Sequence, residues 1–315
     1  MRPYFLADLE LRHLLALQAI AEAGSFWAAA ERLGCSQSAL SQQIATVEGI
    51  LDAKLIERSR GRRVVSVTEA GRLLLRHAEV IVARLRAVHA DFTALAEGGA
   101  GTLTVGTFES SGTCILPQLL REFRAKWPKV EVRLTELAKD DQLLALVERG
   151  ELDLSFSIFP LPSGPFDSVV LLEDPYVLVV AADDRARSRR SITLDDIRSL
   201  PLVGFPPGRS VEQVEAYLRS RGIALNVVFR SNYNGTVQGL AAAGEGAALM
   251  PLSTVDRFRR DTRVLGPISD LPPRVVGLAW HKDRYRSPAA HAFVEAARKV
   301  CAGLGRQLRL TARRR

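Results

Sequence analysis

Apolar residues recur at helical spacing in one stretch near the N-terminus. Ser36 is a residue type that favours helix N-caps. Apolar residues follow it at steps of four, three and four, on one face of a helix: Leu40, Ile44, Val47 and Leu51. Small or amide side chains with almost no charge occupy the opposite face: Ser38, Ser41, Gln42, Ala45 and Gly49. Such a face suits close approach to a DNA major groove, where Gln pairs with adenine edges and Ser with either base. An ordinary amphipathic surface helix is the alternative for this stretch alone.

A second helix precedes this stretch and is separated from it by a very short turn. Ser25 can cap a helix whose apolar residues lie at i, i+3, i+4 and i+7: Phe26, Ala29, Ala30 and Leu33. Gly34 ends this helix, and only Cys35 separates it from Ser36. Two short helices joined by a tight glycine-containing turn, the second with a polar outer face, predict a helix-turn-helix.

Two short β-prone runs with a basic tip between them follow the second helix. Five basic residues and one acidic residue, Glu57, occur over 54–63. The pattern predicts a β-hairpin, which beside a helix-turn-helix would lie along DNA phosphates as a wing. A solvated turn is the alternative. Both motifs together supply the expected DNA contacts: Ser25, Ser36, Gln37, Ser38, Ser41, Gln42, Arg58, Arg60, Arg62 and Arg63.

A heptad pattern then predicts one long helix over 68–97. Its apolar residues alternate between steps of four and three: Leu74, Ala78, Ile81, Leu85, Val88, Phe92 and Leu95. A helix that faces its own core would show a wider stripe, so this seam favours pairing with a second copy of the chain. A two-fold dimer would hold two reading helices for two DNA half-sites. Packing of the helix on its own domain is the alternative.

Beyond a glycine-containing hinge at 98–101, β-type runs alternate with helical patterns up to residue 304. This alternation predicts an α/β domain with largely parallel sheets. Its length of about 200 residues suits two lobes with a cleft between them. We expect the first lobe at about 102–163 and 267–304 and the second at about 164–266. A basic tail, 305–315, follows.

Composition and charge narrow the class of protein. The length of 315 residues suits two or three domains, and no run of about 18 apolar residues predicts a membrane span. Asp8 and Glu10 stand where a signal peptide would need its apolar region, and three distant cysteines make a disulfide framework improbable. We therefore expect a cytoplasmic protein. Most of the net charge of +8 comes from residues 298–315, which include seven basic residues and no acidic one. This segment is either a solvated end of the chain or an accessory contact to DNA phosphates.

Enzyme chemistry finds no support in the sequence. The five histidines lack metal-ligand spacing, and Gly244-Glu-Gly246 stands between a predicted helix and a strand, the wrong order for dinucleotide binding. We predict no catalytic residue, no metal and no cofactor. An exported solute-binding protein is a second rival class, but it would have no use for residues 1–97.

Both halves together resemble the LysR-type transcriptional regulators, over nearly the whole chain. The N-terminal match is the more specific and includes Gly24-Ser25-Phe26, Ala29-Ala30, Ser36-Gln37, Ala39-Leu40-Ser41 and Thr68 with Gly71. The C-terminal match includes Leu116-Pro117, Gly150-Glu-Leu-Asp153 and Ala242-Ala-Gly-Glu-Gly246. Asp52, where the family usually carries glycine, and Ser38, where it carries proline, are departures, and they leave the end of the reading helix open.

The resemblance implies an α+β multidomain chain: an N-terminal winged helix-turn-helix, a long dimerisation linker helix and a C-terminal two-lobed α/β effector domain similar to periplasmic binding proteins. It implies a cytoplasmic homodimer or homotetramer on double-stranded DNA with an interrupted inverted repeat. It also implies a small effector in the cleft, which would alter the contact with RNA polymerase.

The same resemblance points to Ser110 as an effector contact, with Ser111 and Thr113 near it. Hydroxyls and backbone N–H groups at a helix start favour a carboxylate. Lys139 would pair with an acidic effector or point to water. Cys114 could have a lowered pKa at the predicted helix start, although no second cysteine lies nearby in the sequence. Strand ends and loops add further candidates for the cleft: Phe159, Phe205, Asn232, Asn234 and Thr236.

Overall fold

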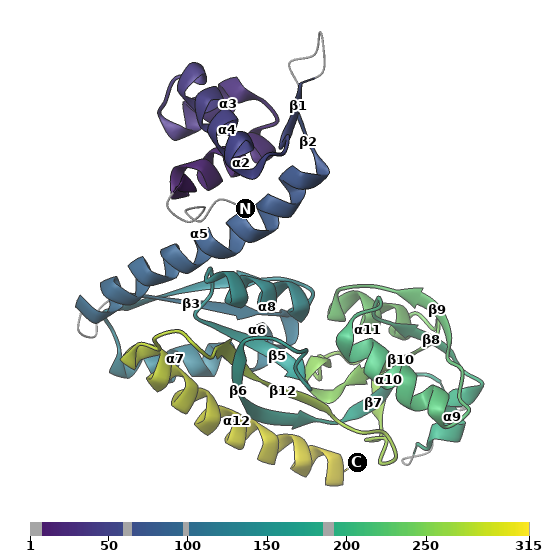
Figure 1. The fold of residues 1–315 in the computed structure, drawn as a ribbon. Coiled ribbons are helices and arrows are strands. Elements are labelled where there is room, and N and C mark those ends of the chain that lie inside the picture. Colours follow the sequence, from purple (N-terminus) through teal and green to yellow (C-terminus); the bar gives the residue numbers. More distant parts are fainter. Residues whose placement is uncertain (1–7, 59–64, 97–100, 185–191, 315) are drawn as a thin grey trace. The chain divides into compact units, whose positions relative to one another are not determined.

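The computed structural model describes residues 8–58, 65–96, 101–184 and 192–314, and it divides into two compact units, Met1–Ala90 and Asp91–Arg315 (Figure 1). The first unit contains three short helices, a two-stranded antiparallel hairpin and the start of a long helix. Their bounds are α2 (Leu11–Ala23), α3 (Phe26–Leu33), α4 (Gln37–Leu51), β1 (Ile56–Arg58), β2 (Val65–Val67) and α5 (Glu69–Ala96). The predicted helix-turn-helix and hairpin are confirmed.

Local capping defines the ends of the short helices. The Ser25 Oγ accepts a hydrogen bond from the Ala28 N–H at 3.2 Å, and the Ser36 Oγ accepts one from the Ala39 N–H at 3.2 Å. Asp52 ends α4 with a φ of 49°, a left-handed conformation that a non-glycine residue rarely adopts and that Asp tolerates better than most. Asp52 stands where the resembled family usually carries glycine, and α4 ends at the position where a glycine would also end it.

The core of the first unit lies between the three short helices. Leu40, Ile44 and Val47 of α4 are buried in it, as their spacing predicts. The Glu48 carboxylate ties α4 to the hairpin, because it accepts hydrogen bonds from the Lys54 Nζ at 2.7 Å and the Leu55 N–H at 2.9 Å. Burial opposes ionisation of Glu48, but these hydrogen bonds outweigh it and lower its pKa.

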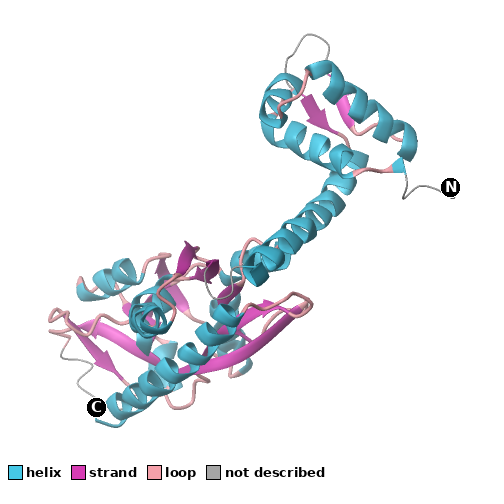
Figure 2. Cartoon of the chain, turned by 90° about the vertical axis from the view of Figure 1, so that its left-hand side faces the viewer, coloured by secondary structure: helices cyan, strands magenta, loops and turns pink. Residues whose placement is uncertain are grey.

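The described residues of the second unit form two five-stranded sheets, each covered by helices (Figures 1 and 2). The sheet of the first lobe has the order β4-β3-β5-β12-β6, and the sheet of the second lobe has the order β11-β7-β10-β8-β9. The first sheet comprises β3 (Gly101–Thr107), β4 (Val130–Glu136), β5 (Leu154–Phe159), β6 (Phe166–Asp174) and β12 (Arg274–His281). The second comprises β7 (Tyr176–Ala181), β8 (Pro201–Gly204), β9 (Asn226–Arg230), β10 (Ala247–Pro251) and β11 (Thr262–Leu265).

Helices complete both lobes. The first lobe carries α6 (Glu109–Cys114), α7 (Leu116–Lys126), α8 (Asp140–Arg149) and α12 (Pro288–Arg314). The second carries α9 (Leu194–Arg198), α10 (Arg209–Ser220), α11 (Asn234–Ala242) and η2 (Leu252–Thr254). Helix α12 runs along β6 and α7 and continues through 305–314, part of the stretch predicted as a separate tail. Leu308 is buried, which explains this continuation, because it extends the apolar face of α12 by one turn.

The sheets differ from the prediction in two respects. Each sheet contains two parallel and two antiparallel pairings, so they are mixed rather than largely parallel. Residues 166–174, which we expected in the second lobe, form β6 in the sheet of the first lobe, where they pair antiparallel with β12. The chain therefore leaves the first lobe only after Asp174 and returns to it at Arg274.

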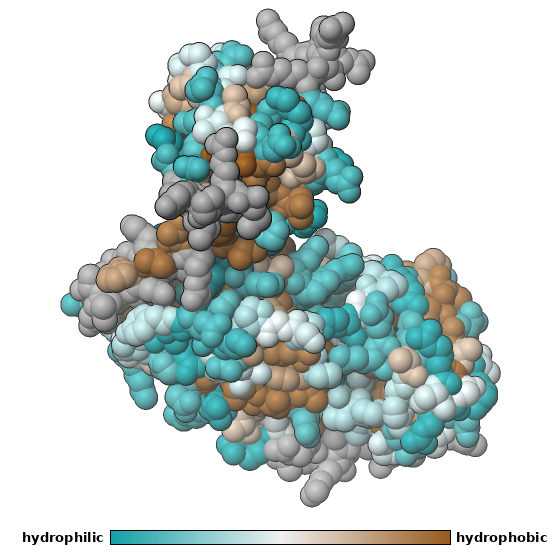
Figure 3. Space-filling view, viewed as in Figure 1, coloured by the Kyte–Doolittle hydropathy of each residue, from teal (hydrophilic) through white to brown (hydrophobic). Residues whose placement is uncertain are grey.

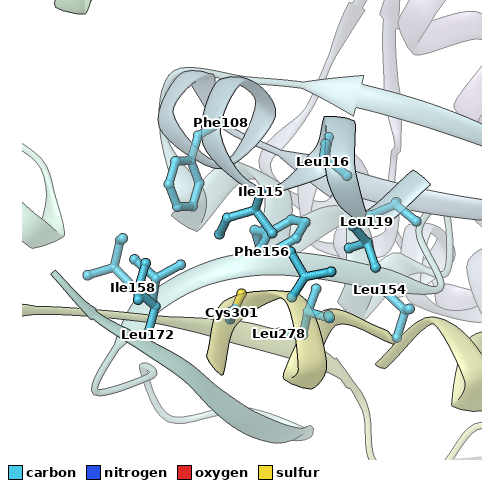
Figure 4. Packing of buried hydrophobic residues seen from close by; sticks show 14 of the residues in the cluster. Phe108, Ile115, Leu116, Leu119, Leu154, Phe156, Ile158, Leu172, Leu278 and Cys301 are labelled. Carbon is cyan, nitrogen blue, oxygen red and sulfur yellow. The ribbon is translucent and has the colours of Figure 1, made fainter. Parts of the chain in front are cut away.

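The larger core extends from the first lobe into one face of the second. Figure 4 shows part of it, with Phe156 and Leu154 of β5 beside Leu278 of β12 and Cys301 of α12. Val203, Ala248 and other residues of the second sheet belong to the same cluster. The opposite face of the second sheet packs a separate core against α9 and α10. Apolar packing thus holds the two lobes against each other.

Candidate functional site

The outer face of α4 matches the polar face predicted from the sequence. Gln37, Ser38 and Gln42 are exposed, together with Ala45 and Gly49, whereas Ser41 is half-buried. Ser36 and Ser38 lie within hydrogen-bonding distance of each other, with 3.0 Å between their Oγ atoms. Ser25 is half-buried at the start of α3. The outer face of α4 therefore presents amide and hydroxyl groups without a charge, which are groups suited to hydrogen bonding with base edges.

The predicted wing is described only at its two strands. Glu57 pairs with Ser66 and Arg58 with Val65 in the antiparallel register of β1 and β2. Arg60, Arg62 and Arg63, and the side chain of Arg58, lie outside the described residues. The two strands belong to the same unit as α4, and residues 59–64 between them lie outside the described residues.

The predicted seam of α5 divides into a packed part and an exposed part. Leu74 packs against the core of the first unit and Ala78 is buried. Ile81, Leu85, Val88 and Phe92 are 43%, 45%, 44% and 68% exposed, and Figure 3 shows brown hydrophobic residues along this helix. The side chain of Leu95 lies outside the described residues. An exposed apolar row at heptad spacing is a surface that a second helix can cover.

A cavity of about 190 Å³ lies between the two lobes of the second unit. Its walls come from the start of α6 and of α8 in the first lobe and from β8, β9, β10 and α10 in the second. Pockets that hold drug-sized ligands are commonly about 300–1,000 Å³, so this cavity suits a small molecule.

Five of the nine predicted effector residues line this cavity: Ser110, Lys139, Phe205, Asn232 and Asn234. Four do not: Ser111, Thr113, Phe159 and Thr236. The Ser111 and Thr113 hydroxyls are used inside α6, where Ser111 bonds to the Phe108 carbonyl at 3.0 Å and Thr113 to the Glu109 carbonyl at 2.9 Å. Phe159 packs its ring on Gly277 of β12, and Thr236 lies exposed on α11. Ser111, Thr113 and Phe159 are thus engaged in local contacts, and Thr236 is exposed to solvent outside the cavity lining.

Arg209, which the sequence analysis missed, joins the two lobes. It begins α10 in the second lobe, and its guanidinium donates to the Ile158 and Pro160 carbonyls of the first. It also lies 3.0 Å from an oxygen of Asp140, which accepts the Ile158 N–H at 2.9 Å. Burial raises the pKa of the Asp140 carboxyl, and the Ile158 N–H and Arg209 oppose this shift. The sequence shows an arginine after a Pro-Pro-Gly turn, which carries no sign of this distant partner.

Arg274, also missed, centres a second cluster where the chain passes between lobes. Its Nη2 donates to Asp174 Oδ2 at 2.7 Å and to the hydroxyls of Ser110 and Ser253 at 3.1 Å each. Ser253 in turn donates to both Asp174 oxygens. The predicted effector contact Ser110 is therefore held by an arginine that lies at the junction of the lobes.

Burial raises the pKa of two of the three thiols, those of Cys114 and Cys301. Cys114 ends α6 instead of beginning a helix, and burial raises its pKa, opposed by the Thr113 hydrogen bond. Burial raises the pKa of Cys301 to about 12. All three cysteines are free. Cys114 does lie next to the predicted helix, since α7 begins at Leu116, but burial of the thiol raises its pKa, so the prediction of a lowered pKa was wrong.

The residues that the structure describes contain no group of three or more His, Cys, Asp or Glu side chains placed to hold a metal ion. No helix among them is both long and apolar enough to cross a membrane.

Both halves of the chain match known family models. The model described as "Bacterial regulatory helix-turn-helix protein, lysR family" matches residues 11–72, and "LysR substrate binding domain" matches residues 96–302. These ranges contain α4 and the interlobe cavity, respectively.

Similar proteins cover nearly the whole chain. The uncharacterized HTH-type transcriptional regulator YcgK of Bacillus subtilis is 30% identical over 303 residues, spanning 89% of this chain and 91% of its own. The DNA-binding transcriptional dual regulator OxyR of Escherichia coli is 29% identical over 295 residues, spanning 93% and 95%. Full-length CbnR, solved with its target DNA, superposes with a TM-score of 0.67 at 25% identity and covers 93% of this chain and all of that one.

Proposed function

The chain belongs to the LysR family of transcriptional regulators, and we propose that it binds an interrupted inverted repeat in double-stranded DNA as a homodimer or homotetramer. The family consists of DNA-binding regulators with an effector-binding domain rather than of enzymes. The observation that carries the proposal for this chain is the exposed, uncharged face of α4 behind a Ser36 cap. In our proposal this face reads bases through Gln37, Ser38, Ser41 and Gln42.

In this proposal phosphate contacts position the reading helix. Arg58, Arg60, Arg62 and Arg63 of the hairpin would supply them, because arginine and lysine side chains provide most sequence-independent affinity for DNA. Ser25 and Ser36 would contact the backbone from the N-termini of α3 and α4. The basic residues beyond Arg298 remain an accessory contact in the same scheme.

The exposed part of the α5 seam supports the dimer. Ile81, Leu85, Val88 and Phe92 leave apolar surface uncovered within one chain. A second α5 packed against this row would bury it and set the separation of the two α4 helices. Two DNA half-sites on one face of the duplex would then be related by the same two-fold axis as the two copies of the protein.

The effector of this proposal is a small carboxylate bound in the interlobe cavity. Among the described residues Lys139 makes no ion pair, whereas three arginines in the lining each pair with a carboxylate: Arg209 with Asp140, Arg230 with Glu215 and Arg274 with Asp174. An anionic group on the effector would give Lys139 its partner. The bound protein would act in the cytoplasm and pass the signal to RNA polymerase.

Fluorescence anisotropy with DNA from upstream of the adjacent gene tests the proposal. At a fixed, stated salt concentration the specific duplex should bind at least about 1,000-fold more tightly than a scrambled duplex of equal length. Gln42→Ala should reduce this preference, while Lys126→Ala on α7 serves as a surface control of the second unit. Equal affinity for every duplex would contradict the proposal.

A further inference from the structure

The lining of the interlobe cavity changes in character from one end to the other. At one end lie polar side chains of the first lobe, of the loop before α11 and of the first residue of α11, which we call the polar mouth: Ser110, Lys139, Asn232, Asn234 and Arg274. The other end runs between α10 and the second sheet, and we call it the apolar arm: Leu202, Val214, Leu225, Val227 and Leu249. One cavity is therefore lined both by polar groups, which include the acidic residues Glu109, Asp140 and Asp141 as well as Lys139, and by hydrocarbon side chains of the second lobe.

The apolar arm exists because α10 packs unevenly on its sheet. Leu202 and Val227 are paired neighbours on β8 and β9, and they belong to the core under α10. Of the α10 residues only Leu218, near the C-terminal end, is buried, whereas Val211 and Val214 in the first two turns stay half-buried. The cavity takes up the space that these first turns leave open. Unfilled apolar space of this kind lacks contacts that a hydrocarbon group can restore.

Two groups of polar side chains near the apolar arm already have protein partners. The Tyr176 hydroxyl and the Ser210 hydroxyl are 3.2 Å apart. Arg230 donates to Glu215 at 2.7 Å and to the Phe205 carbonyl at 2.6 Å. A ligand group that enters the arm would therefore meet carbon and paired polar atoms. A second charged or hydroxylated group there would lose its water without gaining a partner.

We propose that the effector is a monocarboxylate with an apolar hydrocarbon chain, its carboxylate at Lys139 in the polar mouth and its chain under α10 in the apolar arm. This inference rests on the proposed function, which supplies an effector and its acidic group. The same geometry favours a monocarboxylate over short dicarboxylates and sugar acids, because these would place a second polar group among the apolar side chains of the arm. Contact between the ligand's hydrocarbon chain and Val214 would also make the position of α10 depend on ligand length. Helix α10 carries Arg209, which contacts Asp140 of the first lobe.

The test is isothermal titration of the full-length protein with straight-chain carboxylic acids from butanoate to decanoate at one pH. Affinity should rise about fourfold for each added methylene until the arm is full, as expected for burial of a CH₂ group. The primary alcohols of equal chain length are the matched ligands without charge. They should bind at least about tenfold more weakly than the acids, because they offer Lys139 no anion.

Variants of one position separate ligand packing from a general loss of structure. Val214→Ala lengthens the arm and should shift the optimal acid to a longer chain, whereas Val214→Phe should shift it to a shorter one. Val228→Phe, on the exposed surface of β9, is the matched control and should leave the optimum unchanged. Lys139→Gln should weaken the acids and not the alcohols, with Lys126→Gln as its control.

Two contrary results are distinguishable. If short and long acids bind equally, or if the Val214 variants keep the wild-type optimum, the hydrocarbon chain does not occupy the arm and the inference is overturned, while a carboxylate effector stands. If no acid binds, or if alcohols bind as well as acids, the carboxylate effector of the proposed function is itself contradicted. Opposite shifts for Val214→Ala and Val214→Phe support the inference, since a structural defect alone would not produce them.

Discussion

Replacement of Arg274 by methionine tests the polar cluster at the junction of the lobes. Asp174 is fully buried at 0% exposure and the Arg274 side chain is 9% exposed. Removal of one partner from a buried ion pair costs about 3–5 kcal/mol, because the other charge remains without compensation. The wild-type Ser253 donates to Asp174 Oδ1 at 2.9 Å and to Oδ2 at 2.6 Å, and neither hydrogen bond depends on Arg274 as donor. We therefore expect the lower end, a loss of about 3 kcal/mol in the free energy of unfolding.

Urea unfolding at pH 7, followed by tryptophan fluorescence, measures this loss. Trp127 and Trp280 lie in the second unit and Trp27, which is 66% exposed, lies in the first. Trp27→Phe in every variant confines the signal to the unit that contains Arg274. Addition of Asp174→Asn to Arg274→Met removes the orphaned charge, so the double variant should recover at least about 1 kcal/mol.

Two outcomes would refute this reasoning. A loss below about 1 kcal/mol for Arg274→Met would mean that the pair contributes no more than an exposed salt bridge does. A double variant less stable than Arg274→Met would mean that the charge on Asp174 is not the source of the cost. The stability of the junction where the chain leaves the first lobe at Asp174 and returns at Arg274 would then come from apolar packing alone.

Three further predictions follow from the other sites. Gln42→Ala should weaken binding to the specific duplex by about 1–3 kcal/mol in anisotropy titrations and leave scrambled DNA unaffected; an equal loss on both duplexes would argue against base reading. Leu85→Lys places a charge in the exposed α5 seam and should shift sedimentation toward the monomer, while the same change at exposed Leu73, outside the predicted seam, should not; an unaltered oligomer would remove α5 from the interface. Burial raises the pKa of Asp140 above its ordinary 3.8, so the folded state binds this proton more tightly than the unfolded chain. Stability of the wild type relative to Asp140→Asn should therefore fall as the pH rises from about 3.8 through the raised pKa; a difference that increases with pH over this range would contradict the shift.

The parts of the fold that depend on local pattern could be read from the sequence. Ser25 and Ser36 cap the helices that they were expected to cap, and the α4 residues at helical spacing are buried. Helix caps and amphipathic periodicity act within a few residues, so a single sequence contains them. Asp52 shows the same principle, because a residue that tolerates positive φ can replace glycine at the helix end.

The parts that depend on distant contacts could not be read. Arg209 and Asp140 are 69 positions apart, and Arg274 and Asp174 are 100 apart, so no local spacing connects them. The lobe to which β6 belongs depends on its pairing with β12, a strand about a hundred residues later. Ser111 and Thr113 were sensible candidates by residue type, yet their hydroxyls bond within α6. The residues that frame the interlobe cavity are therefore set mainly by the tertiary structure.

Selection from a random library of duplexes by the full-length protein tests the central claim most directly. If two α4 helices read DNA from a symmetric dimer, successive rounds should enrich an interrupted inverted repeat whose half-sites lie about one helical turn or a multiple of it apart. Gln42→Ala should enrich the same spacing with relaxed preference at one base of each half-site. A library that stays random, or that converges on a single unrepeated site, would contradict the account.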